Sequence, residues 1–178
     1  MNGQSLFPII LLFLLLALPA VTGAETFAVY TEESLNHEKA RLPLPIKEGI
    51  LDSLFEMEHM AFDLGPPDLS IDWQQRDFST VISLAGKWEA SYLILSRIQT
   101  TMGNEAKPEM QSAATVQSDV IYYIIAVSSG ELIDQGQLSG NNNGREKELD
   151  YQTLCFNLGS ALGKKVVAKA VAKAVAPK

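Results

Sequence analysis

An uninterrupted apolar run near the middle of the chain constrains the fold more than any other feature. The run, Val120 to Val127, reads Val-Ile-Tyr-Tyr-Ile-Ile-Ala-Val, and its β-branched and aromatic residues favour a strand. Because successive residues of a strand point to opposite faces, a strand that is apolar throughout needs cover on both faces. The run therefore predicts a central strand of a sheet that has other elements packed on it.

The residues that follow this run predict a hairpin. Ser128-Ser129-Gly130-Glu131 is a short turn sequence, and residues 132–138 return as a further strand. Upstream, strands are expected at 25–30, 60–62 and 91–98, with loops at 31–41, 68–76 and 101–108. Amphipathic helices are expected from Pro45 to about His59, from Asp77 or Ser79 to Trp88, and from about Glu146 onward.

These elements give the order β-α-β-α-β-β-β-α. Strands that alternate with helices, followed by a hairpin, predict a mixed sheet with helices packed on it. The fold class is therefore α/β, and the length fits one domain. We expect three segments: a signal peptide at 1–24, the α/β domain at 25–163, and a basic helical tail of Ala, Val and Lys at 164–178.

The first segment has the pattern of a secretory signal. Residues 6–21 are almost entirely apolar, and the small residues Thr22-Gly23-Ala24 precede a polar chain, so cleavage is expected near Ala24. The alternative is an uncleaved anchor, but the apolar run is shorter than the roughly 20 residues that span a membrane. No cysteine lies just after the run, so lipid attachment is not expected. The single cysteine, Cys155, excludes an intramolecular disulfide, which favours a bacterial periplasm over animal secretion.

The net charge of −7 is unevenly distributed. Five of the 14 Lys and Arg residues lie at 164–178, which leaves nine bases against 21 acids, or −12, in the rest of the chain. An acidic body disfavours nucleic acid as a partner.

Candidate catalytic and metal-binding groups are few. Glu56 and His59 share a helix face, but zinc sites take about four ligands that are mostly Cys and His, so we expect a solvated helix end. The Gly159 to Lys164 segment is one residue short of a phosphate-binding loop and is expected inside a helix. Cys155 falls on an apolar helix stripe, which indicates a buried, inert thiol. We expect no catalytic residue, no metal and no cofactor.

Two features are candidate contact sites. Trp73 lies in a loop with Asp68 and Asp72, where it could anchor a partner protein or stack on a sugar ring. The alternative is that Trp73 packs back onto the domain. The second candidate is the tail, because Lys165, Lys169 and Lys173 are four residues apart and form one stripe. That stripe could contact an anionic surface such as a membrane, or it could be a solvated helix end near the negative pole of the helix dipole.

Three segments carry a family resemblance. They are residues 49–55 on the first helix, residues 88–94 entering a strand, and residues 122–133 through the hairpin. In these segments the chain resembles the small α/β domain of the curli-secretion lipoproteins. It is also similar to the amino-terminal domain of the Tol-Pal propeller protein and to lipoprotein activators of peptidoglycan synthases. The resemblance implies a non-enzymatic scaffold of the cell envelope.

The expected function follows from the signal peptide, the charge distribution and the family resemblance together. It is that of an exported, non-enzymatic binding or adaptor protein of the bacterial envelope, which contacts another envelope protein and could form a homo-oligomer. One alternative is a periplasmic protein that binds a small ligand in a deep pocket lined by Tyr122, Tyr123 or Trp88. A second alternative is a hydrolase, although the sequence lacks the convergent acid, base and nucleophile of such a site.

Overall fold

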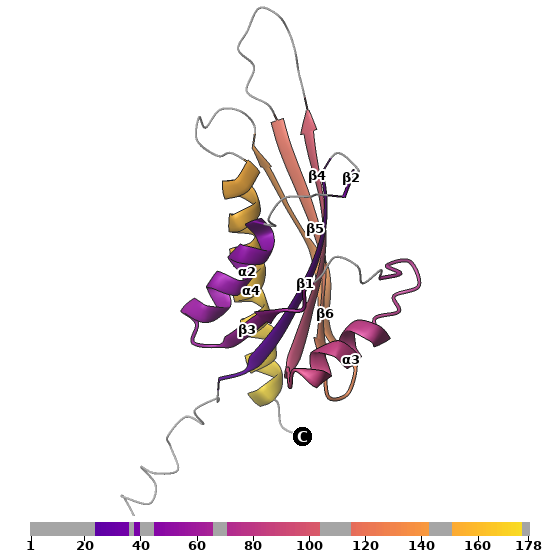
Figure 1. Ribbon diagram of the computed structural model, residues 1–178. Helices are drawn as coiled ribbons and strands as arrows, with labels where there is room; N and C mark the ends of the chain where they lie inside the picture. The colour runs from indigo at the N-terminus through magenta and orange to yellow at the C-terminus, as the bar shows by residue number, and fades with distance from the viewer. Residues whose placement is uncertain are drawn as a thin grey trace, which may run out of the picture.

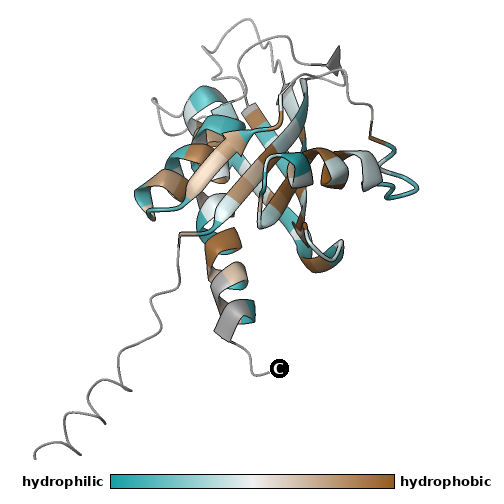
Figure 2. Cartoon of the chain, turned by 60° about the horizontal axis from the view of Figure 1, so that its bottom comes forward, coloured by the Kyte–Doolittle hydropathy of each residue, from teal (hydrophilic) through white to brown (hydrophobic). Residues whose placement is uncertain are grey.

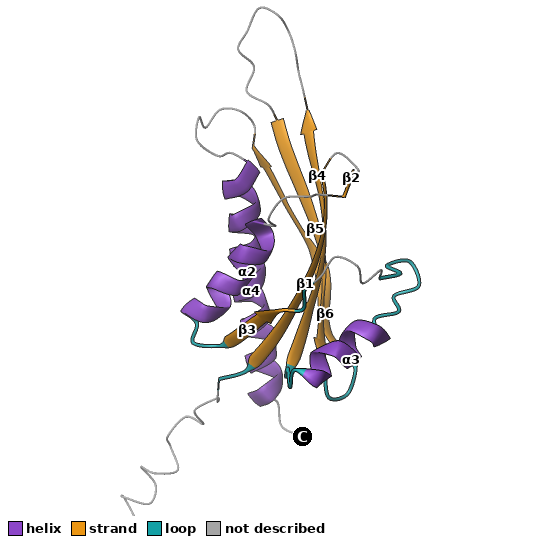
Figure 3. Ribbon diagram, viewed as in Figure 1, coloured by secondary structure: helices purple, strands orange, loops and turns teal. Residues whose placement is uncertain are grey.

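The computed structural model describes residues 24–35, 38–39, 45–65, 71–103, 115–142 and 151–175. Its elements in chain order are β1 (Thr26–Leu35), β2 (Glu38–Lys39), α2 (Pro45–Glu56), β3 (Met60–Asp63), α3 (Ser79–Lys87), β4 (Tyr92–Gly103), β5 (Thr115–Ala126), β6 (Glu131–Asn142) and α4 (Tyr151–Val175). One sheet lies between α2 and α4 on one side and α3 on the other (Figures 1 and 3). The predicted α/β class and element order are confirmed.

The sheet is mixed, as predicted. Its strands lie in the order β2-β1-β4-β5-β6, and β3 pairs with the first half of β1 on the side that β2 occupies at the other end. Strands β3 and β4 run parallel to β1, whereas β5 is antiparallel to both β4 and β6. The strand β6 therefore runs parallel to β1 and β3, and it forms one edge of the sheet.

The strands are longer than the hydrophobic pattern predicts. Strand β1 continues from Thr31 to Leu35, where a loop was expected, because this segment pairs with Ser96 to Thr100 of β4. Strands β4 and β5 likewise pair as far as Gly103 and Thr115. These extensions are rich in polar residues, so backbone pairing rather than apolar patterning defines them. Strand β6 likewise extends to Asn142, beyond the expected end at residue 138.

Two hydrophobic cores lie on the two faces of the sheet. One joins α2 and α4 to alternate residues of β1, β4 and β5, and its fully buried members include Ile50, Ile94 and Tyr122. The other lies under α3 and includes Leu93, Tyr123 and Ile125. The prediction that β5 is covered on both faces is confirmed, except at Ile121, which is 44% exposed because the short α3 covers only part of its face.

Small residues bring α2 and α4 into close contact. A Cβ atom built on Gly159 would lie 2.0 Å from the Ile46 carbonyl oxygen, and one on Gly49 would lie 2.2 Å from that of Phe156. One on Gly163 would lie 1.8 Å from the Ser53 Oγ. The glycines of the Gly159 to Lys164 segment therefore serve helix packing. Cys155 is fully buried on the same helix, as predicted, 3.5 Å from the Ser118 hydroxyl oxygen.

The expected segment boundaries lie near residue 24, where the described chain begins, and inside α4. Of the expected signal peptide, residues 1–23 lie outside the described residues. The helix α4 passes unbroken through residues 163 and 164, and Val166 and Ala170 beyond that point are buried in the core. Among the helices that the structure describes, none combines the length and the apolar character needed to cross a membrane.

Candidate functional site

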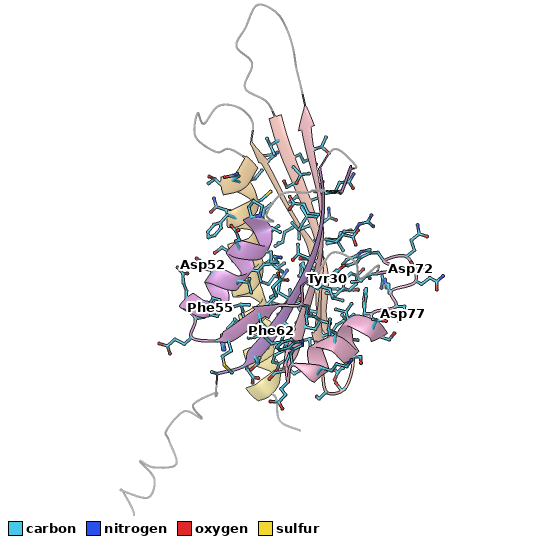
Figure 4. The ribbon with its side chains drawn as sticks, viewed as in Figure 1. Tyr30, Asp52, Phe55, Phe62, Asp72 and Asp77 are labelled. Carbon is cyan, nitrogen blue, oxygen red and sulfur yellow. The ribbon has the colours of Figure 1, made fainter. Side chains whose placement is uncertain are left out.

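Large exposed apolar side chains gather at the β3 edge of the sheet; Figure 2 gives the hydropathy of each residue along the chain. Met60 on β3 is 59% exposed and Trp88, directly after α3, is 65% exposed. Phe62, two residues after Met60 on β3, is half-buried, and its ring centroid is 5.9 Å from that of Trp88. Figure 4 labels Phe62 on this strand. We call Met60, Phe62 and Trp88 the aromatic patch. Exposed aromatic clusters of this kind are typical of protein contact surfaces.

The end of α3 turns Trp88 outward. The helix stops at Lys87, and the N–H groups of Trp88 and Glu89 donate to the carbonyls of Ala85 and Gly86, each at 3.1 Å. Glu89 has a positive φ of 56°, which reverses the chain into β4. The amphipathic helix expected from the sequence runs to Trp88, but α3 ends before that residue. Its exposure is therefore the feature that the sequence analysis missed.

Acidic residues line the outer face of α2, which packs on the opposite face of the sheet from α3. Glu48, Asp52 and Glu56 are four residues apart, so they form a single stripe on the outer face of the helix, and all three are exposed. Phe55, beside this stripe, is 56% exposed. Asp52 and Phe55 lie on the α2 side of the sheet, opposite the turn that carries Asp72 and Asp77 (Figure 4). The outer face of α2 is therefore negatively charged.

Trp73 packs back onto the domain. Its indole Nε1 donates a 2.9 Å hydrogen bond to Glu32 Oε2, and its ring lies 5.9 Å from Phe78 and 6.2 Å from Tyr123, centroid to centroid. Burial and the nearby charge of Glu32 raise the pKa of Tyr30 in the same core. This geometry matches the alternative in which Trp73 is a packing residue, and a binding role for Trp73 stays a prediction.

Asp72 and Asp77 shape the turn around Trp73. Asp72 Oδ1 accepts hydrogen bonds from the backbone N–H groups of Gln74 and Gln75 at 2.9 and 3.1 Å. Hydrogen bonds from the Ser79 hydroxyl and then from its backbone N–H hold the pKa of the Asp77 carboxyl below its usual value. Asp68 lies outside the described residues. The structure therefore places Asp72 beside Trp73, as a turn-forming residue that remains exposed.

The lysine stripe of α4 lies along β6. Lys173 Nζ is 2.6 Å from Glu131 Oε2, and Lys169 Nζ is 4.0 Å from Asp134 Oδ1. Lys165 Nζ lies 4.9 Å from the ring centroid of Tyr122, and a hydrogen bond with the Tyr122 side chain raises the pKa of Lys165. The side chains of Lys169 and Lys173 remain 50% and 38% exposed. Contact of this stripe with an anionic surface stays a prediction.

The position of the Tyr122 ring depends on Gly136, the residue opposite it on β6. The fully buried Tyr122 hydroxyl donates a 3.2 Å hydrogen bond to Asp134 Oδ2, and a Cβ on Gly136 would lie 2.6 Å from that hydroxyl. We expect Gly136→Ala to displace the ring and to lower the free energy of unfolding by about 1–2 kcal/mol. Urea unfolding measures this, with exposed Gln135→Ala as the control; equal stability of the two variants would contradict the contact.

The residues named for a ligand pocket do not converge. Tyr122 and Tyr123 belong to the cores on opposite faces of the sheet, where they are 0% and 8% exposed. Trp88 lies outside both cores. His59, which was weighed with Glu56 as a metal ligand, accepts a 3.2 Å hydrogen bond from the Glu25 backbone N–H. Its ring lies edge-on to that of Phe27. These contacts give His59 a packing role at the end of α2.

No protein-family model matches the sequence, and no curated protein matches it. Solved structures do share its fold. The PelC dodecamer from Paraburkholderia phytofirmans has a TM-score of 0.51 and 13% identity over 85% of this chain and 90% of that chain. Lipoprotein GNA1162 from Neisseria meningitidis has a TM-score of 0.42 and 11% identity over 84% and 99%. The LpoB C-terminal domain from Salmonella enterica has a TM-score of 0.37 and 18% identity over 74% and 93%.

At such identities the likeness is one of fold alone. At that level the PelC structure agrees with the α/β fold that the sequence resemblance implies. Function is argued below from the surface of this chain, because one fold serves many functions.

Proposed function

We propose that this protein is exported to the bacterial envelope and acts there as a non-enzymatic adaptor that binds another protein. Export through a signal peptide cleaved near Ala24, and a periplasmic location, are part of the proposal. The aromatic patch supports it most directly, because a tryptophan that is 65% exposed beside an exposed methionine is costly to leave in water. A partner that covers these side chains removes that cost.

The patch has the composition of a binding hot spot. Trp is among the residues most enriched where truncation weakens binding, and Met adapts to irregular partner surfaces. Trp88 is held in place by the backbone hydrogen bonds at the end of α3 and by its contact with Phe62. A preordered anchor loses less conformational entropy on binding. These features favour protein contact over the alternative of a small-ligand pocket.

We expect Trp88→Ala to abolish binding while the fold stays intact. The test is amine-reactive cross-linking in cells that export the protein, because the exposed Lys87 lies next to the patch. The wild type is expected to give a reproducible cross-linked species, and Trp88→Ala is expected to lose most of it, about tenfold or more for a hot-spot residue.

The matched control is Ile121→Ala, which removes another exposed apolar side chain on β5, three strands away from β3. It should leave the cross-linked species unchanged. If both variants cross-link like the wild type, the patch is not a contact surface and the proposal fails.

A further inference from the structure

We propose that His59 binds the amino group that signal-peptide cleavage releases at Glu25, so that the processed chain is fastened at its new end. The inference rests on the proposed function, because it needs cleavage after Ala24. It concerns a different group of atoms from the aromatic patch, although the two adjoin. Met60, which belongs to the patch, directly follows His59.

The acceptor for this amino group is already in place. The Glu25 backbone N–H donates a 3.2 Å hydrogen bond to His59 Nδ1, in a partly buried contact between residues 34 positions apart in sequence. An imidazole nitrogen that accepts a hydrogen bond carries no proton, so His59 is neutral in this contact and its proton is on Nε2. A primary amine at Glu25 would present its own N–H groups to the same nitrogen.

The end of α2 fixes the position of His59. Glu58 has a positive φ of 63°, and its N–H donates to the Phe55 carbonyl at 3.0 Å. The His59 N–H donates to the Leu54 carbonyl, also at 3.0 Å. This is the Schellman arrangement that ends many helices. The imidazole ring lies edge-on to Phe27, with 5.4 Å between the ring centroids. Backbone and ring of His59 are therefore both held by contacts that do not involve the amine.

The chain at Glu25 is held as well. Its carbonyl accepts a 3.1 Å hydrogen bond from the Met60 N–H, and the Thr26 carbonyl accepts a 2.8 Å hydrogen bond from the Ser91 N–H. Thr26 begins β1, where it pairs with Met60 of β3. Ala24, in contrast, is exposed. Cleavage after Ala24 therefore leaves the hydrogen bonds of the Glu25 and Thr26 carbonyls intact.

Cleavage changes the chemistry of the donor rather than its place. Before cleavage, the Glu25 nitrogen is a neutral amide with one N–H. After cleavage it is an α-amine, which is mostly protonated at neutral pH and then carries three N–H donors. A hydrogen bond from a charged donor is roughly twice as strong as one between neutral groups. The processed chain therefore gains a stronger bond to His59 than the precursor has.

This bond ties the new chain end to the strand that carries part of the aromatic patch. His59 precedes Met60 directly, and the Met60 N–H also holds the Glu25 carbonyl. Strand β3 has only four residues, so a bond at its start is a large share of what holds it. Removal of the signal peptide therefore secures the strand that presents Met60 and Phe62.

The test measures how quickly the α-amine reacts with an acetylating reagent, by mass spectrometry of the N-terminal peptide. Two forms of the protein are compared, one that begins at Glu25 and one that keeps Ala24, each released from a fusion by a site-specific protease. Each form is made with His59 and with His59→Leu, which removes the acceptor nitrogen. The exposed Lys87 gives a reference rate within every sample.

We expect the form that begins at Glu25 to react about fivefold more slowly with His59 than with His59→Leu, the factor for a net hydrogen bond of ordinary strength. The bound amine is slow because it is held as the unreactive ammonium ion. The form that keeps Ala24 should react at one rate with either residue, since its amine lies one residue outside the contact. Circular dichroism verifies folding. If His59→Leu does not fold, the two wild-type forms carry the test, because the form that begins at Glu25 should still be the slower one.

Equal rates for His59 and His59→Leu in the form that begins at Glu25 would overturn the inference, and so would an equal slowing in the form that keeps Ala24. The proposed function is tested by other measurements. The intact mass of the exported protein reports cleavage after Ala24, and Trp88→Ala tests the adaptor role. The amine rates come from forms whose first residue is fixed, so they stand apart from both.

Discussion

Gly159→Ala is expected to lower the free energy of unfolding by about 2–3 kcal/mol, because overpacking at a closed contact forces backbone movement. The new Cβ would lie 2.0 Å from the carbonyl oxygen of Ile46 and 2.9 Å from its carbonyl carbon. Both atoms are backbone of α2, so no side chain can move aside to relieve the clash. The direction of the change in stability is informative. Where no clash occurs, alanine stabilises a helix interior by about 1 kcal/mol relative to glycine.

Gly86→Ala in α3 is the matched control. Its Cβ would meet only Val127 Cγ1, at 3.6 Å, which is ordinary contact. This variant should therefore be as stable as the wild type or slightly more stable. Urea unfolding of both variants measures the difference. Equal stability of Gly159→Ala and Gly86→Ala would mean that α2 and α4 do not cross as closely as described.

Replacing each of the two tryptophans by alanine is expected to lower the stability of the protein by different amounts. Trp73→Ala should destabilise the protein by about 2–3 kcal/mol, below the range for a fully buried tryptophan. It removes the bond to Glu32 and the ring contacts with Phe78 and Tyr123. Trp88→Ala removes a side chain that is 65% exposed, so the loss should stay within about 1 kcal/mol.

Thermal or urea unfolding of the two variants separates packing from surface roles. If Trp73→Ala kept full stability, the role of Trp73 would be at the surface, as an anchor for a partner protein or a sugar ring. A large loss of stability in Trp88→Ala would remove the basis for treating the patch as a binding surface.

Local sequence patterns predicted the elements but not their full lengths. The apolar run of β5, the hairpin turn at Gly130 and the helix from Pro45 each carry a strong local signal, and all three are present. The polar ends of β1 and β4 carry no such signal. The end of β1 is a strand because it pairs with β4, which is more than 60 residues away in sequence, Glu33 with Ile98 for example. The end of β4 is a strand because it pairs with β5.

The candidate site was less predictable than the fold because it depends on the exposure of a single residue, Trp88. Periodicity assigned Trp88 to a buried stripe, and the positive φ of Glu89, which ends that pattern, has no strong sequence signal. The inward position of Trp73 depends on Glu32, 41 residues away in sequence. The glycines of α4 suggested a phosphate loop by spacing, whereas their role is set by the backbone of α2. Each of these outcomes depends on a non-local contact.

Site-specific photo-cross-linking in cells tests the central claim, contact through the aromatic patch, most directly. A photoreactive phenylalanine analogue at Met60 reports from within the patch and leaves Trp88 in place. The same analogue at Gln75, an exposed residue of the turn that precedes α3, is the control. The account predicts protein adducts from position 60 and few from position 75. Adducts equally abundant at both positions, or absent from position 60, would contradict it.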